Sequence, residues 1–298
     1  MIVSLEHYFK GDQGMERQLY RSIVQVIKRV NNRTYNSQGT YSVARIVEVW
    51  FWAVVHDRPI SWACQKSNWP AHLRRKPLPS DATMSRRMRS ALVRSFLLQM
   101  ERRVVRCKSN NNLLWMIDGK PLAISGCSKD RQAGYGRAAN GKAKGYKIHV
   151  ILGKNGSLAD WRLAPMNKDE RVMAHRMLTK TKIQGYLVAD GNYDSNKLYT
   201  ACDHRGNLQF VAPRRYGPGR GLGNRPQASG RLRSMELLEN PTPRFGQWLL
   251  DQRDAIERYF GRLTSWGGGL THLPPWCRTH RQVHRWVQAK MILTSLKP

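Results

Sequence analysis

Two aspartates in this chain occur in the same local context, within the segments MIDGK and VADGN. Asp118 and Asp190 each follow a short apolar run and are each followed at once by glycine. The pattern predicts a strand that ends at the aspartate, at the rim of a sheet where functional groups of α/β folds collect. A carboxylate there is costly unless it is paired, and Mg²⁺ accepts one or two carboxylates per ion. Capping of the turn that follows is the alternative for each aspartate.

A third carboxylate, Glu257, lies in the segment RDAIERYFGRL. Apolar residues recur at helical spacing around it and predict a buried stripe of Leu249, Ile256, Phe260 and Leu263. Glu257 is about 100° round the helix from Ile256, on the border of that stripe. A surface pair with Arg253, one turn earlier, is the alternative and would contribute only a few tenths of a kcal/mol. The position also suits a side chain that points across at a sheet.

Two aspartates after strands and one glutamate on a late helix match what two-metal phosphoryl transfer needs. In such sites two ions lie roughly 3.5–4 Å apart, and they stabilise the attacking and the leaving oxygen. The ions also offset the repulsion between clustered carboxylates and a polyanionic substrate. The three carboxylates are therefore candidates for one metal-dependent site.

The charge of the chain points to a polyanionic partner. Its 298 residues include 51 Lys+Arg against 20 Asp+Glu, a formal net charge of +31. The longest apolar run, VWFWAVV at 49–55, is far shorter than the roughly 20 residues that span a membrane. The first ten residues do not resemble a signal peptide. We expect a cytoplasmic, nucleoid-associated protein that binds double-stranded DNA and no membrane.

The first hundred residues are predicted to be helical. Segments 41–55 and 82–101 both repeat apolar residues at helical spacing. The other face of the second segment carries Arg86, Arg87, Arg89 and Arg94. Short helices followed by an arginine-rich one suit DNA binding, as in a helix-turn-helix variant, and a plain helical bundle is the alternative. We predict that 1–108 is a helical DNA-binding region.

From residue 109 the pattern changes to that of an α/β domain, which we predict to span 109–298. The expected order is three strands, then helix, strand, helix and strand, a long basic loop and a final helix. Lys147 and His149 share one face of a strand predicted to lie next to Asp118, where they could touch phosphate or the metal site; an ordinary polar sheet face is the alternative. Residues 214–234, rich in Gly, Pro and Arg, predict a basic flexible loop that begins with Arg214 and Arg215.

A glycine-rich segment, GYGRAANGKAKG at 134–145, lacks the lysine-serine/threonine ending of a P-loop. It is better interpreted as a basic hairpin tip near DNA. We therefore expect no nucleotide cofactor.

Four segments together resemble a known family. MIDGKPL, KGYKIHV with GSLADWRLAPMNKDE, YLVADGNYDS and IERYFGRL occur in order over roughly 113–290, and they resemble the DDE transposases of bacterial insertion sequences. The resemblance implies a ribonuclease H-like core, a mixed sheet flanked by helices, preceded here by the all-helical N-terminal domain. It implies that Asp118, Asp190 and Glu257 hold two Mg²⁺ or Mn²⁺ ions. The implied chemistry is nicking at the element ends, followed by attack of the freed 3′-OH on target DNA.

One branch of that family carries a Tyr–Arg–Glu–Lys signature around the glutamate. Arg253 and Glu257 fit its spacing, whereas Leu250 and Thr264 stand where the tyrosine and lysine would be, so the chain is not assigned to that branch. A homodimer or larger assembly is expected on DNA. The residues predicted to contact DNA are Lys147, His149, Arg253, Arg86, Arg87, Arg214 and Arg215. A nuclease that does not join strands and a non-catalytic DNA-binding protein derived from a transposase are the alternatives.

Overall fold

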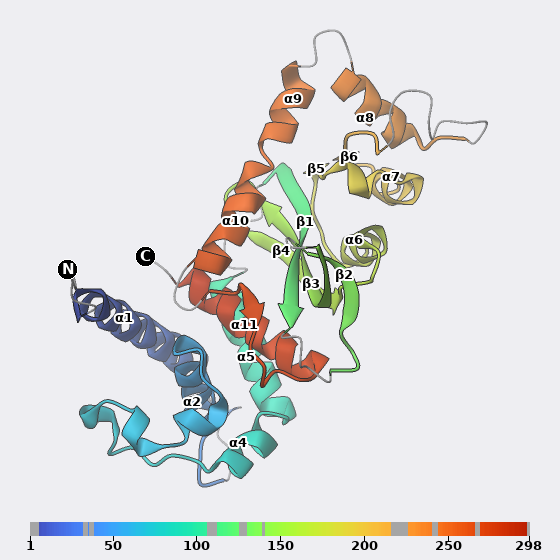
Figure 1. The fold of residues 1–298 in the computed structure, drawn as a ribbon. Coiled ribbons are helices and arrows are strands. Elements are labelled where there is room, and N and C mark those ends of the chain that lie inside the picture. The colour runs from blue at the N-terminus through green and yellow to red at the C-terminus, as the bar shows by residue number, and fades with distance from the viewer. Residues whose placement is uncertain are drawn as a thin grey trace, which may run out of the picture. The chain divides into compact units, whose positions relative to one another are not determined.

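The computed structural model describes two compact units of the chain (Figure 1). The described residues are 6–31, 35, 39–105, 112–124, 130–138, 141–215, 226–239, 244–265 and 269–296. The first unit comprises Met1–Cys107, Arg262–Leu270 and Arg281–Pro298, and the second comprises Lys108–Gly261 and Thr271–His280. No helix within the described ranges has both the length and the apolar character needed to cross a bilayer.

The first unit is helical throughout its described part. Its elements are α1 (Glu6–Val30), α2 (Val43–Val55), α3 (Ile60–Ala63), η2 (Lys66–Asn68), η3 (Ala71–Leu73), α4 (Asp81–Arg87), α5 (Ala91–Val104) and, from its second residue, α11 (His280–Ser295). Helix α11 is joined to the N-terminal part of the unit by two polar contacts. Lys290 Nζ lies 2.7 Å from Asp57 Oδ1, and Gln288 donates to Glu101 at 2.7 Å. The C-terminal segment therefore groups with the first unit, whereas the sequence placed it in the second domain.

The arginine-rich segment at 82–101 forms two helices instead of the single predicted one. Helix α4 ends at Arg87, and the Ser90 side chain accepts a hydrogen bond from the Val93 N–H to begin α5. Serine at this position satisfies a backbone donor that the first turn of a helix leaves open. A helix–turn–helix unit with a three-residue turn replaces one long helix.

The second unit is built on a mixed sheet. Its strands are β1 (Leu114–Ile124), β2 (Gly134–Ala138), β3 (Gly141–Gly153), β4 (Leu158–Pro165), β5 (Gly185–Val188), β6 (Leu208–Val211) and β7 (His272–Leu273). The order is β2-β3-β1-β5-β6, with β4 paired to β3 and β7 paired to β1. β1, β3 and β4 are antiparallel neighbours, whereas β5 and β6 run parallel to β1. The predicted antiparallel start followed by alternating helices and strands is confirmed, but the start has four strands instead of the predicted three, because 134–138 forms β2 and pairs with β3.

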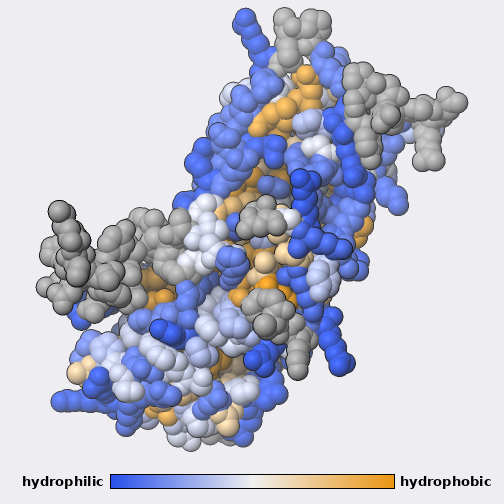
Figure 2. All heavy atoms as spheres, in the orientation of Figure 1, coloured by the Kyte–Doolittle hydropathy of each residue, from blue (hydrophilic) through white to orange (hydrophobic). Residues whose placement is uncertain are grey.

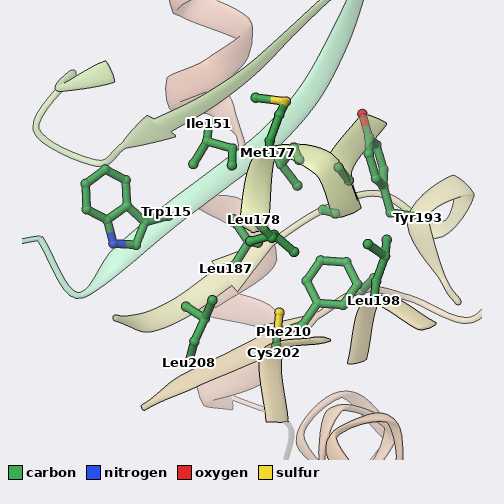
Figure 3. Packing of buried hydrophobic residues seen from close by; sticks show 14 of the residues in the cluster. Trp115, Ile151, Met177, Leu178, Leu187, Tyr193, Leu198, Cys202, Leu208 and Phe210 are labelled. Atoms are coloured by element: carbon green, nitrogen blue, oxygen red, sulfur yellow. The ribbon is translucent and has the colours of Figure 1, made fainter. Parts of the chain in front are cut away.

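Helices α6 and α7 cover one face of this sheet (Figure 1). The helices of the unit are α6 (Glu170–Leu178), η4 (Gly191–Tyr193), α7 (Asn196–Asp203), α8 (Ser229–Glu239), α9 (Arg244–Asp251) and α10 (Asp254–Ser265), the last of which continues into the first unit. Figure 3 shows Trp115 and Ile151 of the sheet facing Met177 and Leu178 of α6. Alternate residues of each strand point to this core.

Part of the predicted basic loop at 214–234 is helix. Residues 229–234 form the start of α8, whereas 216–225 lie outside the described residues. The Asp203 carboxylate accepts from the Gly230 N–H at 2.8 Å and from the Ser229 hydroxyl at 3.1 Å, so α7 caps α8. A Cβ on Gly230 would clash with Asp203 Oδ1. Gly230 lets the α8 backbone approach the Asp203 carboxylate closely. The same glycine is one of those on which the prediction of a flexible loop rested.

Gly230→Ala is expected to lower the free energy of unfolding by about 1–2 kcal/mol, because the methyl group displaces the Asp203 cap. Gly261→Ala is the matched control, since a Cβ there meets nothing within 4 Å. That control should stabilise helix α10 by about 0.5–1 kcal/mol. Urea denaturation of both variants checks the prediction, and equal stabilisation by the two would contradict it.

Candidate active site

The parallel register of β1 and β5 brings Asp118 and Asp190 to the same level. Leu114 pairs with Tyr186 and Met116 with Val188, an offset of 72 residues (186 − 114). The two aspartates differ by the same 72 residues (190 − 118), and paired positions of parallel strands present their side chains on the same face. Asp190 lies two residues beyond the last residue of β5, Val188, so the same offset places it near Asp118 at the end of that strand.

Asp118 lies inside β1, whereas the sequence predicted that the strand ends there. The strand continues to Ile124 because β3 pairs with it as far as Ala123. The Asp118 Oδ1 atom accepts a 2.7 Å hydrogen bond from the Gly119 N–H. Burial raises the pKa of Asp118 from its ordinary 3.8 to about 6, and the charges of Asp190 and Glu170 add to this increase, opposed by the Gly119 N–H and Arg253. Asp118 is therefore a carboxylate in a partly desolvated, acidic environment.

Asp190 shapes the turn that follows it. Its carboxylate accepts from the Asn192 N–H at 2.9 Å and from the Asn192 side-chain amide at 3.2 Å, so it caps the short helix η4. The capping alternative raised from the sequence is thus correct for Asp190. The capping Asp190 carboxylate is still close enough to Asp118 for its charge to raise the pKa of Asp118.

Two buried polar groups next to these aspartates have no hydrogen-bond partner within the described ranges. They are the Tyr193 hydroxyl and the Arg253 Nε. Burial raises the pKa of Tyr193 well above 10, and the charges of Glu170, Asp118 and Asp190 raise it further. Arg253 lowers the pKa of both Asp118 and Tyr193, which places the start of α10 within electrostatic range of the aspartates.

Glu257 lies on helix α10. Its side chain is exposed, one turn after Arg253 on α10, and it forms no ion pair with a described residue. No group of three Asp, Glu, His or Cys side chains in the described part of the chain is arranged to hold a metal ion. The structure brings Asp118 and Asp190 together but does not gather Glu257 with them, so its role as third ligand stays a prediction.

Lys147 and His149 lie behind the strand that carries Asp118. They pair across from Pro121 and Gly119, and alternate residues of a strand face opposite sides, so they are on the face opposite to Asp118. Lys147 Nζ lies 2.5 Å from Glu170 Oε1, and His149 is only 1% exposed.

Burial, and then the charge of Lys147, lowers the pKa of His149 to about 4, so the ring is neutral at pH 7. Neither ring nitrogen of His149 finds a hydrogen-bond partner among the described residues. The predicted contact of Lys147 and His149 with phosphate does not fit these positions. His149 is buried and the Lys147 side chain is 14% exposed, because β3 is flanked by β1 and β4 and packs against α6 on this face.

Sequence reasoning missed Glu170 and Tyr193. Glu170 opens α6, directly after Asp169, whose side chain caps that helix. Tyr193 ends the turn that Asp190 begins. Both belong to segments already quoted for the aspartates, NKDE and DGNYDS, so proximity in sequence to those motifs was the available signal.

The predicted DNA-contacting arginines differ in their surroundings. Arg86 and Arg215 are exposed. Arg87 donates to the Tyr41 carbonyl at 3.0 Å, and Arg214 donates to Glu239 at 2.5 Å. Arg86 and Arg215 are therefore more exposed to solvent than Arg87 and Arg214.

Asp118→Asn is expected to stabilise the metal-free protein above pH 6. The folded state binds the Asp118 proton more tightly than the unfolded state does, so stability is lost as the pH rises from about 4 to about 6. The full loss is on the order of 3 kcal/mol, and a neutral asparagine avoids it.

Melting temperatures in EDTA check this expectation, with Glu236→Gln as an exposed control of the same charge change. The gain in melting temperature that Asp118→Asn brings should be larger at pH 8 than at pH 4.5. If Asp118→Asn melts at a lower temperature than wild type at pH 8, the Asp118 carboxylate does not destabilise the folded protein at that pH.

The donor set at Asp118 and Asp190 fits a divalent cation. The charge of Asp190 raises the pKa of Asp118, and the described cation that opposes this is Arg253, whose Nε has no hydrogen-bond partner among the described residues. Hard oxygen donors of this kind are the ligands that Mg²⁺ and Mn²⁺ prefer. The fit concerns these two aspartates and does not extend to Glu257.

Comparison with known proteins gives one match. A family model described as "Transposase DDE domain" matches residues 113–294, more than half of the chain. Searches of curated proteins and of solved structures gave no match. With the sheet order and the flanking helices, this match supports the predicted ribonuclease H-like fold class.

Proposed function

The chain belongs to the family of transposases with a DDE domain, and from this premise we propose that it is an insertion-sequence transposase. The family implies a DNA substrate. The proposed reaction is metal-dependent strand cleavage at the element ends, followed by transfer of the freed 3′-OH to target DNA. The observation that supports it most is the half-buried Asp118 of β1 beside Asp190, which lies two residues beyond the neighbouring parallel strand β5.

Asp118 and Asp190 are the proposed ligands of two Mg²⁺ or Mn²⁺ ions, with Glu257 as the proposed third carboxylate. When bound, a divalent ion polarises the phosphate and lowers the pKa of an attacking water. Arg253 has an Nε–H that no described residue accepts, and it would donate to a phosphate oxygen. The Lys147–Glu170 ion pair would hold β1 from behind, so that Asp118 keeps its orientation.

DNA is proposed to lie against the helical first unit as well as the second. The exposed Arg86 and Arg215 would contact its phosphates, and Arg87 and Arg214 would do so by exchanging their contacts with Tyr41 and Glu239. A homodimer or larger assembly on DNA is part of the proposal, as are a cytoplasmic, nucleoid-associated location and the absence of a nucleotide cofactor.

One observation favours a second candidate function. Glu257 is exposed, and it forms no metal-binding group of three with the aspartates among the described residues, as expected of a DNA-binding protein derived from a transposase and without catalysis. A nuclease of the same fold, which cuts without joining, is the other alternative.

The test uses purified full-length protein and a DNA fragment that carries both flanks of its gene, with a supercoiled plasmid as target. The proposal expects Mg²⁺-dependent breaks at the element ends and joined products, both abolished by EDTA. Binding without any cleavage would support the non-catalytic alternative, and cleavage without joined products would support the nuclease. Either result would overturn the proposed strand transfer.

A further inference from the structure

Helix α9 presents two aromatic side chains to solvent. Phe245 is 45% exposed and Trp248 is 43% exposed. Their ring centroids are 5.7 Å apart and their planes differ by 17°, so the rings are stacked. Tyr186 of β5 continues the row at 5.4 Å from Phe245, edge to face. Figure 2 shows hydrophobic residues at the surface over α9.

This aromatic surface, defined by Tyr186, Phe245 and Trp248, is bordered by cations. Lys154, in the turn between β3 and β4, holds its Nζ 4.8 Å from the Trp248 ring centroid. Arg244, the first residue of α9, is exposed beside Phe245. The Lys154 ammonium lies over the face of the Trp248 ring, so a base that stacks on that face would displace it toward the adjoining phosphate.

The charge of the chain favours a nucleic acid over a second copy of the protein as the occupant. Two copies that met through this surface would bring Lys154 and Arg244 together, within chains of formal net charge +31. Like charges brought together at an interface oppose association, whereas a phosphate backbone neutralises them. Paired bases are already stacked inside a duplex, so an exposed base face belongs to an unpaired strand.

We propose that Phe245 and Trp248 form a stacking surface for unpaired bases of single-stranded DNA, with Lys154 and Arg244 contacting its phosphates. The proposal rests on the proposed function, because a cleaved element end is where such a strand would arise. The site is separate from the carboxylates, since stacking needs neither metal nor cleavage.

The substitutions that test this leave the anchors of α9 in place. Leu249 is fully buried, and a Cβ on Gly246 would clash with the Leu237 carbonyl of α8, so these two positions hold the helix. Phe245→Ala and Trp248→Ala remove exposed rings only. Trp248→Phe retains a ring, and Leu232→Ala removes a side chain that is 50% exposed on α8 as a matched control.

The experiment measures fluorescence anisotropy of a labelled single-stranded oligonucleotide and of the duplex of the same sequence, with full-length protein in EDTA. Each alanine variant should weaken single-strand binding roughly tenfold. Duplex binding should change less than about twofold, and Trp248→Phe and Leu232→Ala should bind as wild type does. Circular dichroism confirms that each variant is folded.

Unchanged single-strand binding in the two alanine variants, or an equal loss for both DNA forms, would overturn the proposal. So would a change in oligomeric state caused by Trp248→Ala, which would identify a second copy as the occupant. Because no cleavage occurs in EDTA, these results are independent of strand transfer. A protein that fails to cut DNA can still pass this test, and one that cuts can still fail it.

Discussion

Asp118→Asn and Asp190→Asn should each lower the rate of Mg²⁺-dependent strand cleavage by at least about a thousandfold. Residues that act as one catalytic unit show losses of this size when any one is removed. The two carboxylates lie at the same level of neighbouring strands, and an amide keeps the shape of the side chain without its charge. The rate is measured from single-turnover cleavage of labelled element-end DNA.

Glu236→Gln is the control for this pair, because it removes one exposed negative charge elsewhere in the second unit. Its cleavage rate should stay within about twofold of wild type, as a screened surface charge contributes little. If Asp118→Asn and Asp190→Asn also cleave at the wild-type rate, the aspartates are not catalytic.

The same assay separates the two candidates for a third carboxylate. Glu257 carries no ion pair with a described residue, whereas Glu170 is already paired with Lys147 at 2.5 Å. Glu257→Gln should therefore lose cleavage as Asp118→Asn does. Glu170→Gln should retain more activity, since it removes the ion pair of Lys147 but no metal ligand. If Glu170→Gln loses more cleavage activity than Glu257→Gln, the third metal ligand is Glu170. The assignment of Asp118 and Asp190 would not change.

Asp194→Ala should lower the free energy of unfolding by about 3–5 kcal/mol, the second large effect. The Asp194 carboxylate accepts from Arg231 at 2.8 Å and at 2.7 Å, and the two side chains are only 5% and 8% exposed. Removing the acid leaves a buried guanidinium without its partner. Thermal and urea unfolding, followed by circular dichroism, measure the loss.

A double variant, Asp194→Leu with Arg231→Met, should recover much of that stability, because neither charge is then buried alone. Arg258→Ala is the exposed comparison, since Arg258 and Asp254 are 3.9 Å apart and about 70% exposed. Its effect should be below about 1 kcal/mol. A similar loss in Arg258→Ala and Asp194→Ala would contradict the dependence on burial.

Local sequence signals predicted the elements that carry the candidate site. The apolar runs before Asp118 and Asp190 are strands, and their separation in sequence equals the offset of the parallel register. The helical stripe of Ile256, Phe260 and Leu263 is buried as the spacing indicated. These predictions are correct because side-chain alternation and helical period are properties of a short segment.

Features that depend on distant partners could not be derived from a segment alone. β1 continues beyond Asp118 because β3 pairs with it, and α11 groups with the first unit through Lys290 and Asp57. The face of the sheet to which His149 points follows from the same pairing. Apolar spacing also continues unbroken across Ser90, so it concealed the cap that begins α5.

Titration of the protein with Mn²⁺, with the free ion followed by electron paramagnetic resonance, tests most directly whether the aspartate pair holds a divalent cation. Wild type and Glu236→Gln should bind Mn²⁺, and Asp118→Asn and Asp190→Asn should each weaken that binding at least about tenfold. Equal Mn²⁺ affinity in all four proteins would contradict the assignment of Asp118 and Asp190 as metal ligands.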